Sequence, residues 1–143
     1  MASLVYNRFA YNLGTAGISL TTDVIKMSLH TSEYVPAKTH NTSTDLTNEI
    51  ASTSSTDYTA GGFTLANKAL TEDDANDYVK WDADDVTLGS ATLTARIAVI
   101  RLAIDAGSSD LVCAFDFGSN QTATAGDFTV AFSTDGLLQF QST

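Results

Sequence analysis

The sequence has little cysteine and few basic residues, and each shortage excludes a structural feature or a function. A single cysteine, Cys113, permits no disulfide bond within the chain, which fits folding in a reducing cytosol. Cys113 alternates with the apolar residues Leu111, Phe115 and Phe117, so we expect a buried, inert thiol. At 143 residues the chain has the size of one domain that buries its own core without a covalent staple.

The chain is acidic: it has 17 acidic residues and 7 lysines and arginines, for a formal net charge of −10. Nucleic-acid binding depends on neutralising phosphates with basic side chains, so this composition disfavours that role. No apolar run approaches the length of a membrane span, and the first twenty residues lack the basic and apolar regions of a secretory leader. We therefore expect a soluble, unexported chain with neither nucleic acid nor membrane as partner.

Sequence patterns of common catalytic sites are also missing. The chain has no Gly-x-Ser-x-Gly elbow, no phosphate-binding glycine loop and no cysteine and histidine pairs at zinc spacing. His30 and His40 lie far from Cys113 in the sequence, so only folding could assemble a Cys/His nucleophile. We predict no enzyme activity, no catalytic residues and no cofactor.

A cluster of acids between residues 72 and 85 is the one candidate for a metal site, because Ca²⁺ prefers several carboxylate oxygens. An EF-hand loop that began at Asp82 would have Thr87 where glycine is required and Leu93 where glutamate is required. We therefore predict solvated turns and no metal site. The acids are Glu72, Asp73, Asp74, Asp77, Asp82, Asp84 and Asp85.

The stretch from 77 to 104 contains the only tryptophan and the longest strand-like pattern. Val79, Trp81 and Ala83 alternate with polar residues, which predicts a half-buried strand with Trp81 in the core. Gly89 and Ser90 then predict a turn at which the chain reverses.

The run that follows this turn is apolar on both faces as far as residue 104. Ile97 and Val99 fall on one face, and Ala98, Ile100 and Leu102 fall on the other, together with Ile104. Both faces therefore need cover, either from a helix of the same chain or from another subunit.

The remaining segments predict one short helix and several strands. Residues 4–13 have helical spacing, with Ser3 as N-cap and Gly14 as the stop; alternatively, residues 2–14 form an arm that grips a neighbouring subunit. Residues 25–30 predict a strand with one wet face. Residues 31–62 form a long irregular loop, which either contains a helical turn near 45–49 or is a functional arm.

Further strands are predicted at 63–70, 111–117 and 128–132, and the sequence Ser133-Thr134-Asp135-Gly136 predicts a hairpin into a strand at 138–140. With about eight short strands, the fold class is all-β. We expect an antiparallel β-sandwich or jelly-roll-like domain that spans residues 1–143 and has a short N-terminal helix.

Five groups of residues resemble, in the same order, a family of small virion structural proteins of tailed bacteriophages. They are Tyr6-Asn7-Arg8-Phe9-Ala10-Tyr11-Asn12-Leu13, Asp45-Leu46-Thr47-Asn48-Glu49, Tyr58-Thr59-Ala60-Gly61-Gly62, Asp82-Ala83-Asp84-Asp85-Val86-Thr87 with Ala91-Thr92-Leu93-Thr94-Ala95-Arg96, and Asp116-Phe117-Gly118 with Ala125-Gly126-Asp127-Phe128. The resemblance implies a non-enzymatic building block. The expected role is a decoration or cement protein on the outer surface of the head, made in the host cytoplasm. The alternative is a tail component or a receptor-binding module that binds glycan.

Partner contacts are expected where apolar residues exceed what one sheet face needs. These residues are Phe9, Leu13, Ile100 and Leu102. The expected partners are the major capsid protein or other virion proteins, together with further copies of the chain in a homo-oligomer for which a trimer is favoured.

Overall fold

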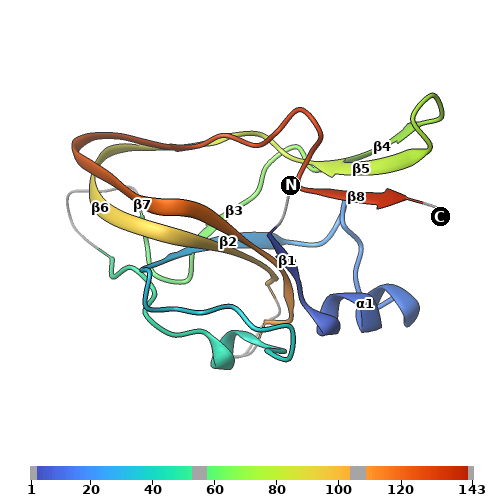
Figure 1. Ribbon diagram of the computed structural model, residues 1–143, viewed down its shortest axis with the longest axis horizontal. Coiled ribbons are helices and arrows are strands. Elements are labelled where there is room, and N and C mark those ends of the chain that lie inside the picture. The colour runs from blue at the N-terminus through green and yellow to red at the C-terminus, as the bar shows by residue number, and fades with distance from the viewer. Residues whose placement is uncertain (1–2, 53–57, 104–108, 142–143) are drawn as a thin grey trace.

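The computed structural model describes residues 3–52, 58–103 and 109–141 (Figure 1). Its elements are β1 (Leu4–Val5), α1 (Asn7–Gly14), β2 (Ile25–His30), the 3-10 turn η1 (Ser43–Asp45), β3 (Phe63–Thr64), β4 (Ala69–Asp73), β5 (Tyr78–Asp82), β6 (Val86–Leu102), β7 (Leu111–Val130) and β8 (Leu138–Gln141). Eight strands and one short α-helix in these residues confirm the predicted all-β class.

The strands form two antiparallel sheets, ordered β1-β7-β6-β2-β3 and β4-β5-β8. The long strands β6 and β7 reach beyond the first sheet. Residues 97–102 of β6 pair with β2, whereas residues 86–95 pair only with 121–130 of β7. We call this second part, residues 86–95 and 121–130, the outer ribbon. Figure 1 shows it curling away from β2 and running back on the same side as β4, β5 and β8, so the hairpin contributes to both layers of a sandwich-like fold.

Irregular pairing accounts for the curl. Ala95 pairs with Gln121 and Ile97 with Asp116, so residues 117–120 of β7 oppose only Arg96. Extra residues on one strand bend an antiparallel pair and increase its twist. Gly118, within this insertion, has φ of +81°.

Gly89 and Ser90 form another irregularity instead of the predicted turn. Ser90 has φ of +50°, and the register shifts between Leu88 and Ala91, yet β6 runs on without reversing. The predicted reversal was wrong because a glycine-marked break in alternation is common to turns and bulges.

The core between the two layers contains Trp81, which is 0% exposed, as predicted. Its indole Nε1 donates a hydrogen bond to the Leu20 carbonyl oxygen at 3.0 Å. Cys113 is also buried, as predicted, and burial raises the pKa of its thiol. A thiol held in its neutral form is a poor nucleophile.

Both faces of β6 are covered by the chain itself. Ala98, Ile100 and Leu102 belong to the main core, and Ile104 lies outside the described residues. Ile97 and Val99 lie in a separate cluster with Tyr6 and Tyr34, and Leu46 packs against this cluster. The cover of this face therefore includes part of the 31–62 segment. On the other face, Phe9 of α1 belongs to the core cluster that holds Ile100 and Leu102. The helical turn η1 in the described part of the 31–62 segment lies at Ser43–Asp45, slightly before the predicted position.

Strand β2 has no wet face, contrary to the prediction. Ser28 and His30, on the expected solvent side, are both 0% exposed. His30 also forms an isolated bridge with Glu49, so the irregular segment lies along the end of β2. The sequence pattern was misleading because polar side chains can be buried where other polar groups satisfy them.

The predicted N-terminal helix begins too early. Leu4 and Val5 form β1 and pair with β7, and the helix starts at Asn7 after Tyr6. The Ser3 hydroxyl accepts a hydrogen bond from the Asp116 amide at 2.9 Å and does not cap the helix. Two residues of strand pairing replace the first helical turn.

Two other predicted strands are assigned differently. Residues 63–70 divide into β3 and the start of β4, which belong to different sheets. The turn before Gly136 is present, with its amide bonded to the Ser133 carbonyl oxygen at 2.8 Å. However, β8 pairs with β5 and forms no hairpin with β7.

Candidate interaction surface

The outer ribbon is almost free of charge. Its twenty residues, 86–95 and 121–130, include one charged side chain, Asp127, in a chain with 17 acids and 7 basic residues. Its exposed face carries threonine hydroxyls in cross-strand pairs: Thr87 with Thr129, and Thr94 with Thr122, each at 2.9 Å. This face is polar yet uncharged.

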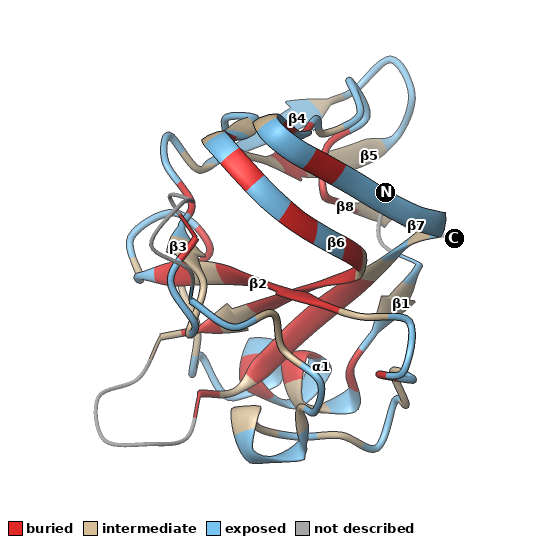
Figure 2. Ribbon diagram, turned by 90° about the vertical axis from the view of Figure 1, so that its left-hand side faces the viewer, coloured by how far each residue is buried: buried red, intermediate tan, exposed pale blue. Residues whose placement is uncertain are grey.

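The outer edge of β7 is open beyond its first residues. On the side away from β6, β1 pairs only with Cys113 and Ala114. Among the described residues, no strand pairs with 117–130 on that side. Figure 2 shows this part of β7 at the margin of the ribbon, mostly in the colour of exposed residues. Such an edge presents unpaired amide and carbonyl groups to solvent.

A hollow of about 430 Å³ lies against β7. We call it the β7 hollow; it is lined by Phe117, Gln121, Thr122, Asp127, Phe128, Thr129, Val130 and Ala131. A smaller hollow of about 130 Å³ shares Phe117, Val130 and Ala131 with it. The volume of the β7 hollow is within the range of ligand sites, which is about 300–1,000 Å³.

Of the described residues that line the β7 hollow, Asp127 alone is charged. Among the described residues, its carboxylate makes no hydrogen bond and no ion pair. The nearby Asp116 is different, because its Oδ1 accepts from Arg96 Nε at 2.9 Å and from the Gly118 amide at 2.8 Å. The hydrogen bond from Arg96 is the main reason that the pKa of Asp116 lies below its usual value. Asp127 is therefore the carboxylate that is available to a ligand.

No protein-family model, curated protein or solved structure matches this chain. The sequence signal that could have identified the outer ribbon is its lack of charge over two distant segments. That signal is visible only when 86–95 and 121–130 are known to pair, since each segment alone is an ordinary strand.

The four residues predicted to bind a partner are not brought together on a surface. Phe9, Ile100 and Leu102 are 3%, 0% and 7% exposed and belong to the chain's own core. Only Leu13, at 43%, is accessible. Covered side chains cannot contact a partner, so the expectation fails for these three residues. The predicted homo-oligomer stays a prediction and draws no support from them.

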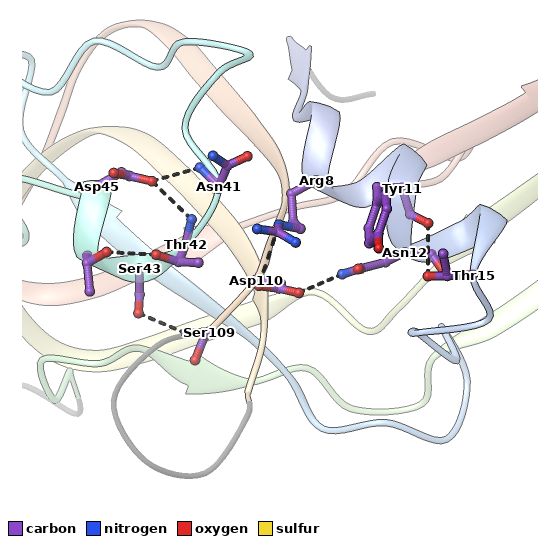
Figure 3. A network of polar contacts seen from close by, with 11 residues as sticks. Arg8, Tyr11, Asn12, Thr15, Asn41, Thr42, Ser43, Asp45, Ser109 and Asp110 are labelled. Carbon is purple, nitrogen blue, oxygen red and sulfur yellow. Dashed lines mark hydrogen bonds and ion pairs between the residues drawn. The ribbon is translucent and has the colours of Figure 1, made fainter.

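Polar contacts tie α1 to its own chain (Figure 3). Asn12 Nδ2 donates to Asp110 Oδ2 at 2.9 Å, and Arg8 Nε lies 3.8 Å from Asp110 Oδ1. Ser43 and Ser109 exchange two hydrogen bonds, of 2.8 and 3.0 Å, which join η1 to the start of β7. The helix is thus docked on this chain, and the described residues 3–14 do not extend as an arm.

The acids predicted to lie in solvated turns are divided between strands and turns. Glu72 and Asp73 lie in β4, Asp82 lies in β5, and Asp74 and Asp77 lie in the turn that joins these strands. Asp73 accepts hydrogen bonds from Asn76, which are the main reason that its pKa is lowered. Residues 69–73 are strand, so the turn begins later than the sequence indicated. Within the described part of the chain, no three His, Cys, Asp or Glu side chains are close enough to hold a metal ion. No described helix is long and apolar enough to cross a membrane.

His30 is buried with both ring nitrogens bonded. Its Nδ1 lies 2.8 Å from the Thr47 carbonyl oxygen, and its Nε2 lies 2.9 Å from Ser28 Oγ. Because a carbonyl oxygen only accepts, Nδ1 carries the hydrogen of the neutral ring, and Nε2 accepts from the serine hydroxyl. Burial is the main cause of its lowered pKa; Arg101 lowers the pKa further, while the bond to Thr47 and the charge of Glu49 oppose the shift.

We expect this histidine to make the fold less stable at mildly acidic pH. The unfolded chain binds a proton near the ordinary histidine pKa of about 6.5, whereas folded His30 resists protonation. The free energy of unfolding should therefore fall as the pH decreases from 7.5 to 5.5, as measured by urea unfolding. The decrease should be smaller in His30→Gln. An equal pH dependence in the wild type and His30→Gln would contradict this assignment.

Proposed function

We propose that this chain is a non-enzymatic structural protein of a tailed-bacteriophage virion. Its role is that of a decoration or cement protein that binds the outer surface of the head. The partners are the major capsid protein or other virion proteins. It would be made in the host cytoplasm and carried on the capsid surface.

The distribution of charge is the observation that most supports a binding role. A chain of net charge −10 keeps one twenty-residue ribbon free of charge apart from Asp127. The centres of protein interfaces are depleted of charged residues, because removing a charge from water costs free energy. The outer ribbon, with its open β7 edge, is therefore the surface best suited to contact another protein.

The residues that carry the family resemblance also make contacts that hold the fold together, which suits a structural protein. Tyr58 Oη donates to Glu49 Oε1 at 2.7 Å, which joins two of the resembling segments. Arg96 and Asp116, from two others, form an ion pair at 2.9 Å. These contacts hold the irregular segment and the curl of β7 in place. The shared residues thus support the architecture of the chain.

Binding to heads that lack the chain is the direct test of the proposal. Purified protein should cosediment with such heads at low salt. Binding should weaken as salt rises, because the Debye length falls from about 10 Å at 0.1 M to about 3 Å at 1 M and screens attraction between the acidic chain and basic capsid residues. Intact heads that already carry the chain are the matched control. Failure to bind deficient heads at any salt concentration would overturn the capsid role.

One observation favours a second candidate, a tail module that binds host glycan. The β7 hollow is lined by the aromatic residues Phe117 and Phe128 and by the polar residues Gln121, Asp127 and Thr129. Sugars are bound by aromatic faces together with hydrogen-bonding side chains. Saturable binding to a purified host surface glycan, lost on substitution of Asp127, would favour this role over the capsid role.

A further inference from the structure

We infer that the β7 hollow is a docking site for an extended segment of a virion partner, which adds a strand to the open edge of β7. The inference rests on the proposed function and specifies how the partner would attach. The segment is expected to present an apolar side chain to the hollow and a basic side chain to Asp127.

The lining of the hollow indicates an edge site. Five consecutive residues, 127–131, line it. Side chains alternate between the two faces of a strand, so a hollow on one face would be lined by every second residue. Because the hollow contacts all five, together with Phe117, Gln121 and Thr122 from the earlier part of the strand, we place it against the edge of the bent strand. An extended chain is the occupant that matches such an edge, because its own amides and carbonyls complete the ladder.

The edge has few of the features that usually prevent strand addition. Proteins protect open edges with lysine, proline, charge or irregular backbone. From 117 to 130, β7 has no lysine and no proline and one acid. Its irregular pairing lies at 117–120 and near Ala125, whose φ is +47°. Residues 128–130 are in regular register with 86–88, so a partner could pair along the last part of the strand.

The negative charge of this chain and of Asp127 favours a basic partner segment over a second copy of the chain. Two copies would bring a net charge of −10 each, and their Asp127 carboxylates would lie at one shared edge. Like charges that face one another across a sheet are destabilising. A segment with a lysine or arginine opposite Asp127 would instead form a charge-assisted hydrogen bond. Phe117, which lines the hollow and is only partly buried, would contact a neighbouring side chain of that segment.

Backbone hydrogen exchange of the chain in virions, compared with the free chain, tests the geometry. Strand addition should slow exchange in 126–131 while leaving 86–95, on the opposite margin of the same ribbon, unchanged. Equal slowing of both strands would indicate docking through the threonine face and would overturn the inference. Unchanged exchange in both strands would also overturn it.

Charge reversal tests the chemistry. Asp127→Lys should bind deficient heads about tenfold more weakly, the size expected when a charge-assisted hydrogen bond is lost. Asp127→Asn should bind with intermediate affinity. Glu33→Lys is the matched control, since Glu33 is also exposed and makes no side-chain hydrogen bond or ion pair among the described residues. Circular dichroism would verify that all variants fold.

The outcomes separate this inference from the proposed function. If the wild type and Asp127→Lys bind heads equally, the capsid role stands and the docking site is wrong. If the wild type binds no virion component, both the proposed function and the proposed virion partner are wrong. A wild-type dimer in solution that Asp127→Lys dissociates, or a glycan bound in the hollow, would also overturn the inference.

Discussion

Replacement of Trp81 by alanine is expected to lower the free energy of unfolding by about 3–5 kcal/mol, the usual cost of a large-to-small change of a buried aromatic residue. Trp81 is 0% exposed and lies between the two layers. The variant also removes the donor to the Leu20 carbonyl oxygen, which would be left without that partner. Both losses act in the same direction.

Urea unfolding followed by circular dichroism measures this effect without relying on the removed fluorophore. Tyr11→Ala is a suitable control, because Tyr11 is 62% exposed and contacts Arg8 only through a ring-to-guanidinium distance of 5.7 Å. Its cost should stay below about 1 kcal/mol. In the wild type, Trp81 should emit at short wavelength and shift to longer wavelength on unfolding. A cost for Trp81→Ala as small as that for Tyr11→Ala would contradict the placement of the core.

Gly62→Ala is expected to have the next largest effect. A Cβ atom at this position would lie 2.1 Å from the Met27 carbonyl oxygen, and φ is +81°. The left-handed backbone costs an alanine roughly 1–2 kcal/mol. The overlap with β2 adds about 1–3 kcal/mol, as overpacking typically does, because backbone atoms cannot rotate away. The β2–β3 pairing next to Gly62 should therefore loosen.

Gly118→Ala separates the two causes. Gly118 also has φ of +81°, but a Cβ there would meet nothing within 4 Å. Only the backbone cost should remain, so Gly118→Ala should lose about 1–2 kcal/mol in the same urea unfolding assay. Equal losses in the two variants would show that Gly62 does not pack against β2 as described.

Local alternation predicted the parts of the fold that depend on one strand at a time. The burial of Trp81 follows from its phase relative to Val79, and the apolar faces around Ile97 and Ile100 were both recognised as needing cover. The source of that cover could not be predicted. Tyr34 and Leu46 lie in a segment without periodicity, and their docking depends on long-range contacts with Tyr6 and Val99.

The main error was to predict strand ends where the strands continue, and it has one physical cause. Glycines at 89 and 118 and the irregular stretch before Phe128 read as strand ends, although β6 and β7 continue through all of them. A bulge and a turn both use residues that tolerate positive φ, so the sequence of one strand does not distinguish them. The partner strand decides, because pairing on both sides of the irregularity keeps the chain extended.

The candidate surface was missed for the same reason. Phe9, Ile100 and Leu102 were predicted to contact a partner because they are apolar, yet most apolar side chains are buried in the core of their own chain. The outer ribbon and the β7 edge become recognisable only from pairing. Thr94 and Thr122 are 28 positions apart, and their hydroxyls meet only because β6 and β7 form one hairpin.

Electron microscopy of virions labelled with an antibody against this chain tests the capsid role. We expect label distributed over the surface of the head. Label confined to tails would contradict the capsid role and favour the glycan-binding alternative, and virions without label would contradict both.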